Sequence, residues 1–313
     1  MSRTGVSKAG RFGRGLCLLC LASALAIGAG CAGTVANLAA GALSIEGGSF
    51  ASDDDPELVR AAVPFGLKAI ESLLDEAPEN PKLLLAAAAG FTEYTYGFIQ
   101  QDADELTATQ PEAGRQMNIR ARKLYARAAE YGMRGLESRH GGFRAQFAKD
   151  RAAAVAAIGK DDVPLLYWTG AALGSLISLS MDDMAAIGRL NEVEALMGRA
   201  LELDEGYGDG AIHEFYVNYD GCRSPAMGGS VARAKAHYER ALALSNHKKV
   251  GPLVTWAEVV AVQVQDRRLF DELLAKALAF NVDDAPRFRL TNLIAQRRAR
   301  FLKAHAQDLF IQE

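Results

Sequence analysis

The feature that most constrains this chain is a spacing shared by several of its apolar segments. A small or apolar residue is followed by a larger one four positions later, and by alanine after three more. Residues at these spacings share one face of an α-helix, so each helix gains a ridge beside a slot for its neighbour. We therefore expect an all-α fold. The pattern occurs at Ala121, Tyr125 and Ala128; at Val193, Met197 and Ala200; at Ala234, Tyr238 and Ala241; and at Phe270, Leu274 and Ala277.

The residues between these segments predict helical hairpins. Asp55-Pro56 places an acid at a helix N-cap and proline at the first helical position. The run 78–81 (PENP) ends that helix and begins the next one. No sustained strand pattern lies between the helical runs. Later helices are expected at about 83–101, 113–138, 143–158, 163–180, 183–204, 209–219, 230–245, 252–264, 267–280 and 285–309.

The shared spacing is typical of the second helix of tetratricopeptide repeats. Trp168, followed by Ala171 and Ala172, fits the first helix of such a repeat, although the distance from Trp168 to Val193 exceeds that of a standard repeat. We expect one domain over 55–313, built as a superhelix of cryptic tetratricopeptide-like hairpins. An irregular helical bundle is the alternative. Stacked hairpins would present a concave surface that binds partners or ligands.

The N-terminus has the features of an export signal. Four cations precede the uncharged stretch Gly15 to Gly30, which ends in small residues. This order predicts a cleaved signal peptide over 1–30, with a retained transmembrane helix as the alternative. The four cations are Arg3, Lys8, Arg11 and Arg14.

Cys31 is the expected site of lipidation. The segment Gly28-Ala29-Gly30-Cys31 resembles the lipobox of bacterial lipoproteins, although Gly28 stands where that motif prefers an aliphatic residue. Ordinary signal cleavage is the alternative. Two or three acyl chains would make a durable membrane anchor. Because Ala32 replaces the aspartate that favours inner-membrane retention, the periplasmic face of the outer membrane is the expected location. Residues 31–54 are small and Gly-rich, and predict a flexible tether.

Composition and motifs argue against several classes of function. The chain carries 35 basic and 38 acidic residues and no basic stripe interleaved with aromatics, which argues against a nucleic-acid partner. Its five histidines form no metal-ligand spacing, and Gly-rich phosphate loops and Gly-x-Ser-x-Gly are absent. We expect no catalytic residue, metal or cofactor. Once Cys31 is acylated, only Cys222 remains in the mature chain, so no internal disulfide is expected.

Two aromatic clusters mixed with polar residues are candidate ligand contacts. The first, 91–98, includes Tyr94 and Tyr96, which cannot face the same way on a helix, so one should border a wetter surface. The second is 213–219 (HEFYVNY). The alternative for the first is an ordinary core helix, and for the second a repeat helix with one exposed face.

Three long segments, 53–104, 213–242 and 289–302, together resemble the TatT family. These proteins are the lipoprotein T components of tripartite ATP-independent periplasmic (TRAP) transporters. The likeness includes the non-periodic stretch Pro225 to Ser230, which packing alone would not dictate. It implies an α-helical fold with cryptic tetratricopeptide-like repeats, a homotrimer with a pore through each subunit, and docking of a periplasmic solute-binding protein. The ligand it implies is a small, hydrophobic organic acid.

The leading hypothesis is therefore a periplasm-facing lipoprotein accessory to TRAP-type uptake, which binds a solute-binding protein and passes a small organic ligand. The alternative is an envelope scaffold that uses its repeats for protein–protein interaction. Under the transport hypothesis, the candidate pocket residues are Tyr94, Tyr96, Tyr167, Trp168, Phe215 and Tyr216, with Glu93, His213 and Asn218 as polar contacts.

Overall fold

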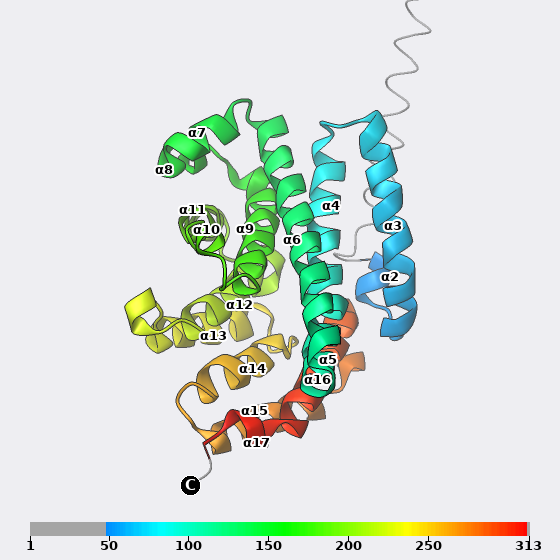
Figure 1. The fold of residues 1–313 in the computed structure, drawn as a ribbon, viewed down its shortest axis with the longest axis vertical. Coiled ribbons are helices and arrows are strands. Elements are labelled where there is room, and N and C mark those ends of the chain that lie inside the picture. The colour runs from blue at the N-terminus through cyan, green and yellow to red at the C-terminus, as the bar shows by residue number, and fades with distance from the viewer. Residues whose placement is uncertain (1–47, 312–313) are drawn as a thin grey trace, which may run out of the picture.

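The structure, a computed structural model, describes residues 48–311 and is built from helices joined by short loops (Figure 1). No strand occurs within these residues, so the expected all-α class is confirmed. The expected signal peptide, the lipidation site Cys31 and most of the expected tether lie outside the described residues. In the part of the chain that is described, no helix combines the length and apolarity needed to cross a membrane.

The first helix of the expected hairpin begins at the predicted cap, and the second begins within the predicted run 78–81. The Asp55 carboxylate accepts hydrogen bonds from the backbone N–H groups of Glu57 and Leu58, and Asn80 caps the following helix in the same way. The predicted first hairpin therefore forms, and its second arm extends beyond the expected end. The elements are α2 (Gly48–Ala51), α3 (Pro56–Glu76), α4 (Pro81–Tyr94), the π-helical η1 (Thr95–Gln100), α5 (Gln101–Thr109) and α6 (Pro111–Arg139).

In the middle of the chain, two expected helices are each divided in two. The single helix expected at 143–158 is wrong because Asp150 adopts an extended conformation and caps a new helix through the N–H of Ala153. The helix expected at 183–204 is likewise interrupted around Gly188 and Arg189. The elements are α7 (Phe143–Lys149), α8 (Arg151–Ala156), η2 (Lys160–Asp162), α9 (Val163–Ser178), α10 (Met184–Ile187), α11 (Leu190–Leu203) and α12 (Tyr207–Gly221).

The C-terminal part starts with a side-chain cap. Ser230 accepts a hydrogen bond from the N–H of Arg233 and opens the next helix. The helix expected at 285–309 instead begins at Arg289 and is interrupted at His305. The elements are η3 (Pro225–Met227), α13 (Val231–Leu244), α14 (Gly251–Thr255), the π-helical η4 (Trp256–Ala261), α15 (Arg267–Ala279), η5 (Val282–Asp284), η6 (Pro286–Phe288), α16 (Arg289–Ala304) and α17 (Ala306–Leu309).

The shared small–large–alanine spacing forms the buried faces of the helices. Consecutive helices pack side by side: α4 against α6, α6 against α9, α9 against α11, and α12 against α13. Tyr125 on α6 and Phe270 on α15 are among the largest fully buried side chains. One core spans α3 to α11 and reaches Ile212 and Leu290, and a second runs from α12 to α17. Stacking in chain order thus buries most apolar surface between neighbours.

The last long helix returns to the start of the described chain. Helix α16 contacts α2 and α3, and Figure 1 shows it beside α5. The Gln101 side-chain amide donates to the backbone carbonyl of Ile294 (3.4 Å), and the Arg289 guanidinium donates to that of Ser52 (2.8 Å). Phe50 of α2, at the end of the expected tether, packs against the core. The row of helices therefore closes on itself, with α16 bridging its two ends.

Candidate functional site

Five polar side chains from five elements meet near the point of closure, and we call them the central polar cluster. Tyr96 comes from η1, Asp104 from α5, Glu214 from α12, Glu258 from η4 and Arg298 from α16. The charges of all four other members act on the pKa of the Tyr96 hydroxyl. The cluster therefore joins residues that are up to about 200 positions apart in the sequence.

Two π-helical segments supply the cluster with Tyr96 and Glu258. In η1, the Thr95 hydroxyl donates to the carbonyl of Phe91 (2.6 Å), and Gly97 lies so close to α16 that an added Cβ would be 3.0 Å from Ile294 Cδ1. Such back-bonding from threonine and close approach loosen the regular turn. Because π-helical turns are frequent at functional sites, their convergence from opposite ends of the chain marks this region.

Tyr96 is both exposed and surrounded by protein. Its side chain is 57% exposed, yet desolvation, followed by the charge of Glu258, raises the pKa of its hydroxyl to about 12. The ring is therefore open to water, while charged groups of four other elements still act on its hydroxyl.

Arg298 connects two carboxylates of the cluster. Its guanidinium donates to Asp104 Oδ2 (2.8 Å) and to both carboxylate oxygens of Glu258. Burial lowers the pKa of Arg298, but its hydrogen bonds to Glu258 and the charges of both acids outweigh that effect and raise it. For Asp104, burial raises the pKa and Arg298 opposes the rise. Arg298 thus supplies positive charge to two partly buried carboxylates.

A second ion-pair network lies on the adjacent face of the α5–α16 contact. Asp102 is paired with both Arg60 of α3 and Arg297 of α16, and its side chain is 10% exposed. Arg297 also pairs with Glu105 (2.8 Å). These pairs connect α3, α5 and α16, so they stabilise the closure of the helical array.

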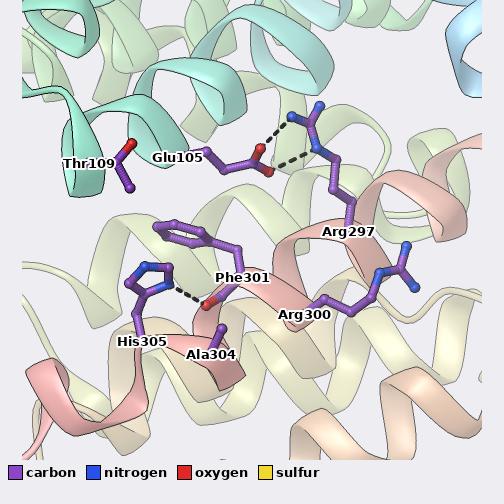
Figure 2. Close-up of a pocket in the computed structure, with 7 residues that line it drawn as sticks. All are labelled: Glu105, Thr109, Arg297, Arg300, Phe301, Ala304 and His305. Carbon is purple, nitrogen blue, oxygen red and sulfur yellow. Dashed lines mark hydrogen bonds and ion pairs between the residues drawn. The ribbon is translucent and has the colours of Figure 1, made fainter.

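Beside this network is an open surface groove of about 460 Å³, which we call the outer groove. Figure 2 shows the ring of Phe301 between Glu105 and His305, with the ion pair of Arg297 above it and the Arg300 side chain extending from α16. The His305 ring donates through Nδ1 to the carbonyl of Phe301 (2.9 Å). The groove is lined by Glu105, Thr109, Arg297, Arg300, Phe301, Ala304 and His305.

Of the candidates on the first aromatic cluster, only Tyr96 belongs to the central polar cluster. Tyr94 is buried at 7% exposure and packs against Phe98, with ring centroids 5.8 Å apart. Glu93 is half-buried on α4. The expectation that one of the two tyrosines faces a wetter surface is confirmed.

Tyr167 and Trp168 lie at another place in the array. Trp168 is buried against Ala88 and Ala89 of α4, and it meets Tyr167 edge to face with centroids 4.8 Å apart. Tyr167 in turn contacts the ring of Tyr207 (5.2 Å). These two candidates therefore form part of the packing between α4, α9 and the start of α12.

The candidates on α12 form an aromatic and histidine group with α13. The Nδ1 atoms of His213 and His237 are 2.8 Å apart, and Tyr216 stacks on the His237 ring at 4.8 Å. Phe215 stacks on Tyr219 (5.5 Å). Asn218 is exposed. The α12 residue of the central polar cluster is instead Glu214, which was not among the predicted pocket residues.

The histidine pair predicts loss of stability in acid. Burial lowers the pKa of both His213 and His237 from 6.5, and the charge of His237 lowers that of His213 further. At the contact between the two rings, one Nδ1 must accept the hydrogen bond. The other charged groups that act on the pair are Glu205, Asp220, Arg233 and Arg240. Since the unfolded chain binds more protons below about pH 6.5, the free energy of unfolding should fall as pH drops through that range.

Urea titrations at a series of pH values measure this effect. The variant His237→Gln should lose part of the acid dependence, whereas His247→Asn, which changes an exposed histidine in a left-handed turn, should keep it. Equal pH dependence in both variants and the parent would contradict a role for the pair.

Four members of the central polar cluster were missed from the sequence: Asp104, Glu214, Glu258 and Arg298. Each is a charged residue on a helix, a class whose usual place is a solvated surface. Their pairing depends on the return of α16 to α5. The charged run 297–300 (RRAR) in an otherwise amphipathic helix was the available signal, and it lies inside one of the segments that resemble TatT.

The fold and the site together define a class: all-α proteins with a closed helical array that contains an ion-paired polar cluster. Comparison with known families is consistent with it: a family model described as "TRAP transporter T-component" (TAtT) matches residues 52–310. The chain belongs to this family, which supports an accessory role in a TRAP system. It is also similar to an uncharacterized protein of Treponema pallidum (strain Nichols), with 29% identity over 266 residues, covering 84% of this chain and 82% of that protein.

Proposed function

We propose that the protein is a non-catalytic, periplasm-facing lipoprotein of a TRAP-type uptake system, which binds a periplasmic solute-binding protein and passes a small organic ligand through its interior. The observation that carries the ligand-passing part is the exposure of Tyr96: its side chain is more than half exposed, although charged groups of four other elements act on its hydroxyl. Membership of the T-component family supports the partner.

The array is best described as a tetratricopeptide-like superhelix. Three observations support this description: consecutive helices pack side by side, the small–large–alanine faces are buried, and glycines on α6 and α9 allow neighbouring helices to approach closely. A superhelix of this kind encloses a concave inner surface. The return of α16 to α5 would convert that surface into a passage, with the central polar cluster on its wall.

The anchor and the assembly complete the proposal. Acylation of Cys31 would hold the folded part, over residues 55–313, at the periplasmic face of the outer membrane by a tether. Mass spectrometry of the mature N-terminus tests this part, because an unmodified peptide starting beyond Cys31 would eliminate lipidation. A homotrimer is the assembly implied by resemblance to the TatT family. The exposed apolar side chains of Leu58 (59%) and Phe65 (79%) on one face of α3 are consistent with association.

A pull-down from native membranes tests the partner. Full-length tagged protein solubilised in mild detergent should recover a TRAP solute-binding protein, identified by mass spectrometry. The matched control carries the same tag on residues 1–54 alone. It should recover no solute-binding protein, because it retains the expected export signal and lipidation site and lacks the helical domain. Recovery of no solute-binding protein by the full chain would remove the transport function. Recovery of envelope-assembly proteins instead would support the scaffold alternative.

A further inference from the structure

We propose that a second groove, between α3 and α6, binds an acidic segment of a partner protein through two stacked arginines. The inference rests on the proposed function and deepens it, because it gives the solute-binding protein a docking surface and a chemistry. The groove has a volume of about 400 Å³, and we call it the arginine groove. Helix α4 lies between the two helices that line it (Figure 1). Its polar lining consists of Lys68, Glu71, Asp75, Arg127, Tyr131 and Arg134.

A pair of aromatic rings supports two arginines of α6 in this groove. Phe91 of α4 and Tyr131 of α6 stack with their ring centroids 5.9 Å apart. The guanidinium carbon of Arg127 lies 5.3 Å from the centroid of the Phe91 ring, and that of Arg134 lies 5.4 Å from the centroid of the Tyr131 ring. Phe91 is buried at 3% exposure, so the support is fixed in the core. A stacked guanidinium can still donate from the N–H groups in its own plane, which is the geometry that recognises carboxylates.

The two guanidinium groups keep most of their donors available. Arg134 donates to the backbone carbonyl of Pro78 (2.8 Å), and it forms no ion pair with any residue in 48–311. Arg127 makes one ion-pair contact, 3.4 Å to Glu71 Oε1, and its side chain is 48% exposed. Both arginines can therefore form charge-assisted hydrogen bonds with acids from outside the chain.

The acids of the groove leave it with a net positive charge. Glu71 accepts hydrogen bonds from the Tyr131 hydroxyl (2.7 Å) and from Lys68 Nζ (2.5 Å). Burial raises the pKa of the Glu71 carboxyl, but these hydrogen bonds and the charge of Arg127 together lower it below its ordinary value. Glu71 thus acts as an internal anchor for Lys68 and Tyr131. Asp75 is exposed to water, and the polar lining contains three cations and two acids.

The spacing of the two arginines fits a protein segment better than a single small anion. Arg127 and Arg134 are seven residues apart on α6, which is about 10.5 Å along the helix axis. One carboxylate or phosphate group is too small to bridge that distance, whereas successive acidic side chains of a protein can meet both arginines. Arginine and tyrosine are also among the residues that contribute most to binding at protein interfaces.

Neutral variants test the inference in the pull-down described above. Full-length Arg127→Gln/Arg134→Gln should recover at least about tenfold less solute-binding protein than the parent, because two charged contacts are lost. The matched control is Arg115→Gln/Arg120→Gln, which removes two exposed arginines of α6 outside the groove and should leave recovery unchanged. Arg134→Lys keeps the charge without the planar stack, so it should give an intermediate recovery. Circular dichroism checks that each variant retains the helical content of the parent.

A defined probe tests the same chemistry without the natural partner. Fluorescence anisotropy with a labelled oligo-glutamate peptide at pH 7 and low salt should show binding to the parent that Arg127→Gln/Arg134→Gln weakens about tenfold or more. Arg300→Gln, in the outer groove, is the control and should leave this binding unchanged. Inorganic phosphate and vesicles that contain anionic lipid, added at equal concentration of charge, should not displace the peptide.

The outcomes separate this inference from the proposed function. Equal recovery of a solute-binding protein by the parent and by Arg127→Gln/Arg134→Gln would overturn the arginine groove as the docking surface and leave the transport function standing. Recovery of none by the parent would remove the transport function, while the oligo-glutamate peptide would still decide the chemistry of the groove. Peptide binding that the double variant does not weaken, that Arg300→Gln weakens instead, or that phosphate or vesicles displace would overturn the acidic segment.

Discussion

Replacing Gly132 with leucine should lower the free energy of unfolding by more than about 3 kcal/mol, or prevent folding. Gly132 is where α6 crosses α9. A Cβ at this position would lie 2.9 Å from Cβ of Thr169 and closer still to its Oγ1. The intrinsic gain from removing a helical glycine is only about 1 kcal/mol, so the collision dominates. Leucine adds three further carbons in the same direction, and α9 would have to move away.

Chemical denaturation followed by circular dichroism measures this loss. The matched control is Gly159→Leu, because Gly159 has an extended backbone and a Cβ there meets nothing within 4 Å. Its change should stay within about 0.5 kcal/mol. Similar unfolding midpoints for both variants would show that α6 and α9 can separate freely, which would remove close stacking as the basis of the array.

The helices could be predicted from sequence wherever the information was local. The four small–large–alanine faces were identified from spacing alone, and Ala121, Tyr125 and Ala128 are all fully buried. The cap at Asp55 was likewise predicted, since an N-cap depends on one residue and the next three backbone N–H groups. The opposite orientation of Tyr94 and Tyr96 followed from helical geometry.

Breaks and long-range contacts could not be predicted in the same way. Asp150 ends α7 and starts α8 within a run of apolar spacing that looked continuous, because an aspartate is compatible with both a helix surface and a cap. The π-helical turns of η1 and η4 depend on tertiary contacts such as that of Gly97 with Ile294. The partners of Arg298 depend on the position of α16 in the fold, and no local sequence pattern encodes that position.

For Arg298, replacement by methionine should lower the free energy of unfolding by about 3 kcal/mol at pH 7. The change removes the cation that Asp104 and Glu258 share and retains most of the apolar stem. Arg298 is 19% exposed, and its partners are 30% and 33% exposed. Because the three side chains are partly exposed, the decrease in the free energy of unfolding should lie at the lower end of the range for breaking a buried ion pair. Two partly desolvated carboxylates would then repel each other and Glu214.

Acidification distinguishes this mechanism from simple loss of packing. Burial already raises the pKa of Asp104, and removal of Arg298 should raise it further. The folded variant then binds more protons than its unfolded chain, so its stability rises relative to the parent as pH falls from 7 toward 4. The matched control is Arg300→Met, two residues along α16, an exposed arginine without an ion pair to any described residue. It should change stability by less than about 0.5 kcal/mol at either pH. A deficit in Arg298→Met that stays constant or grows on acidification would mean that repulsion between the carboxylates is not its cause.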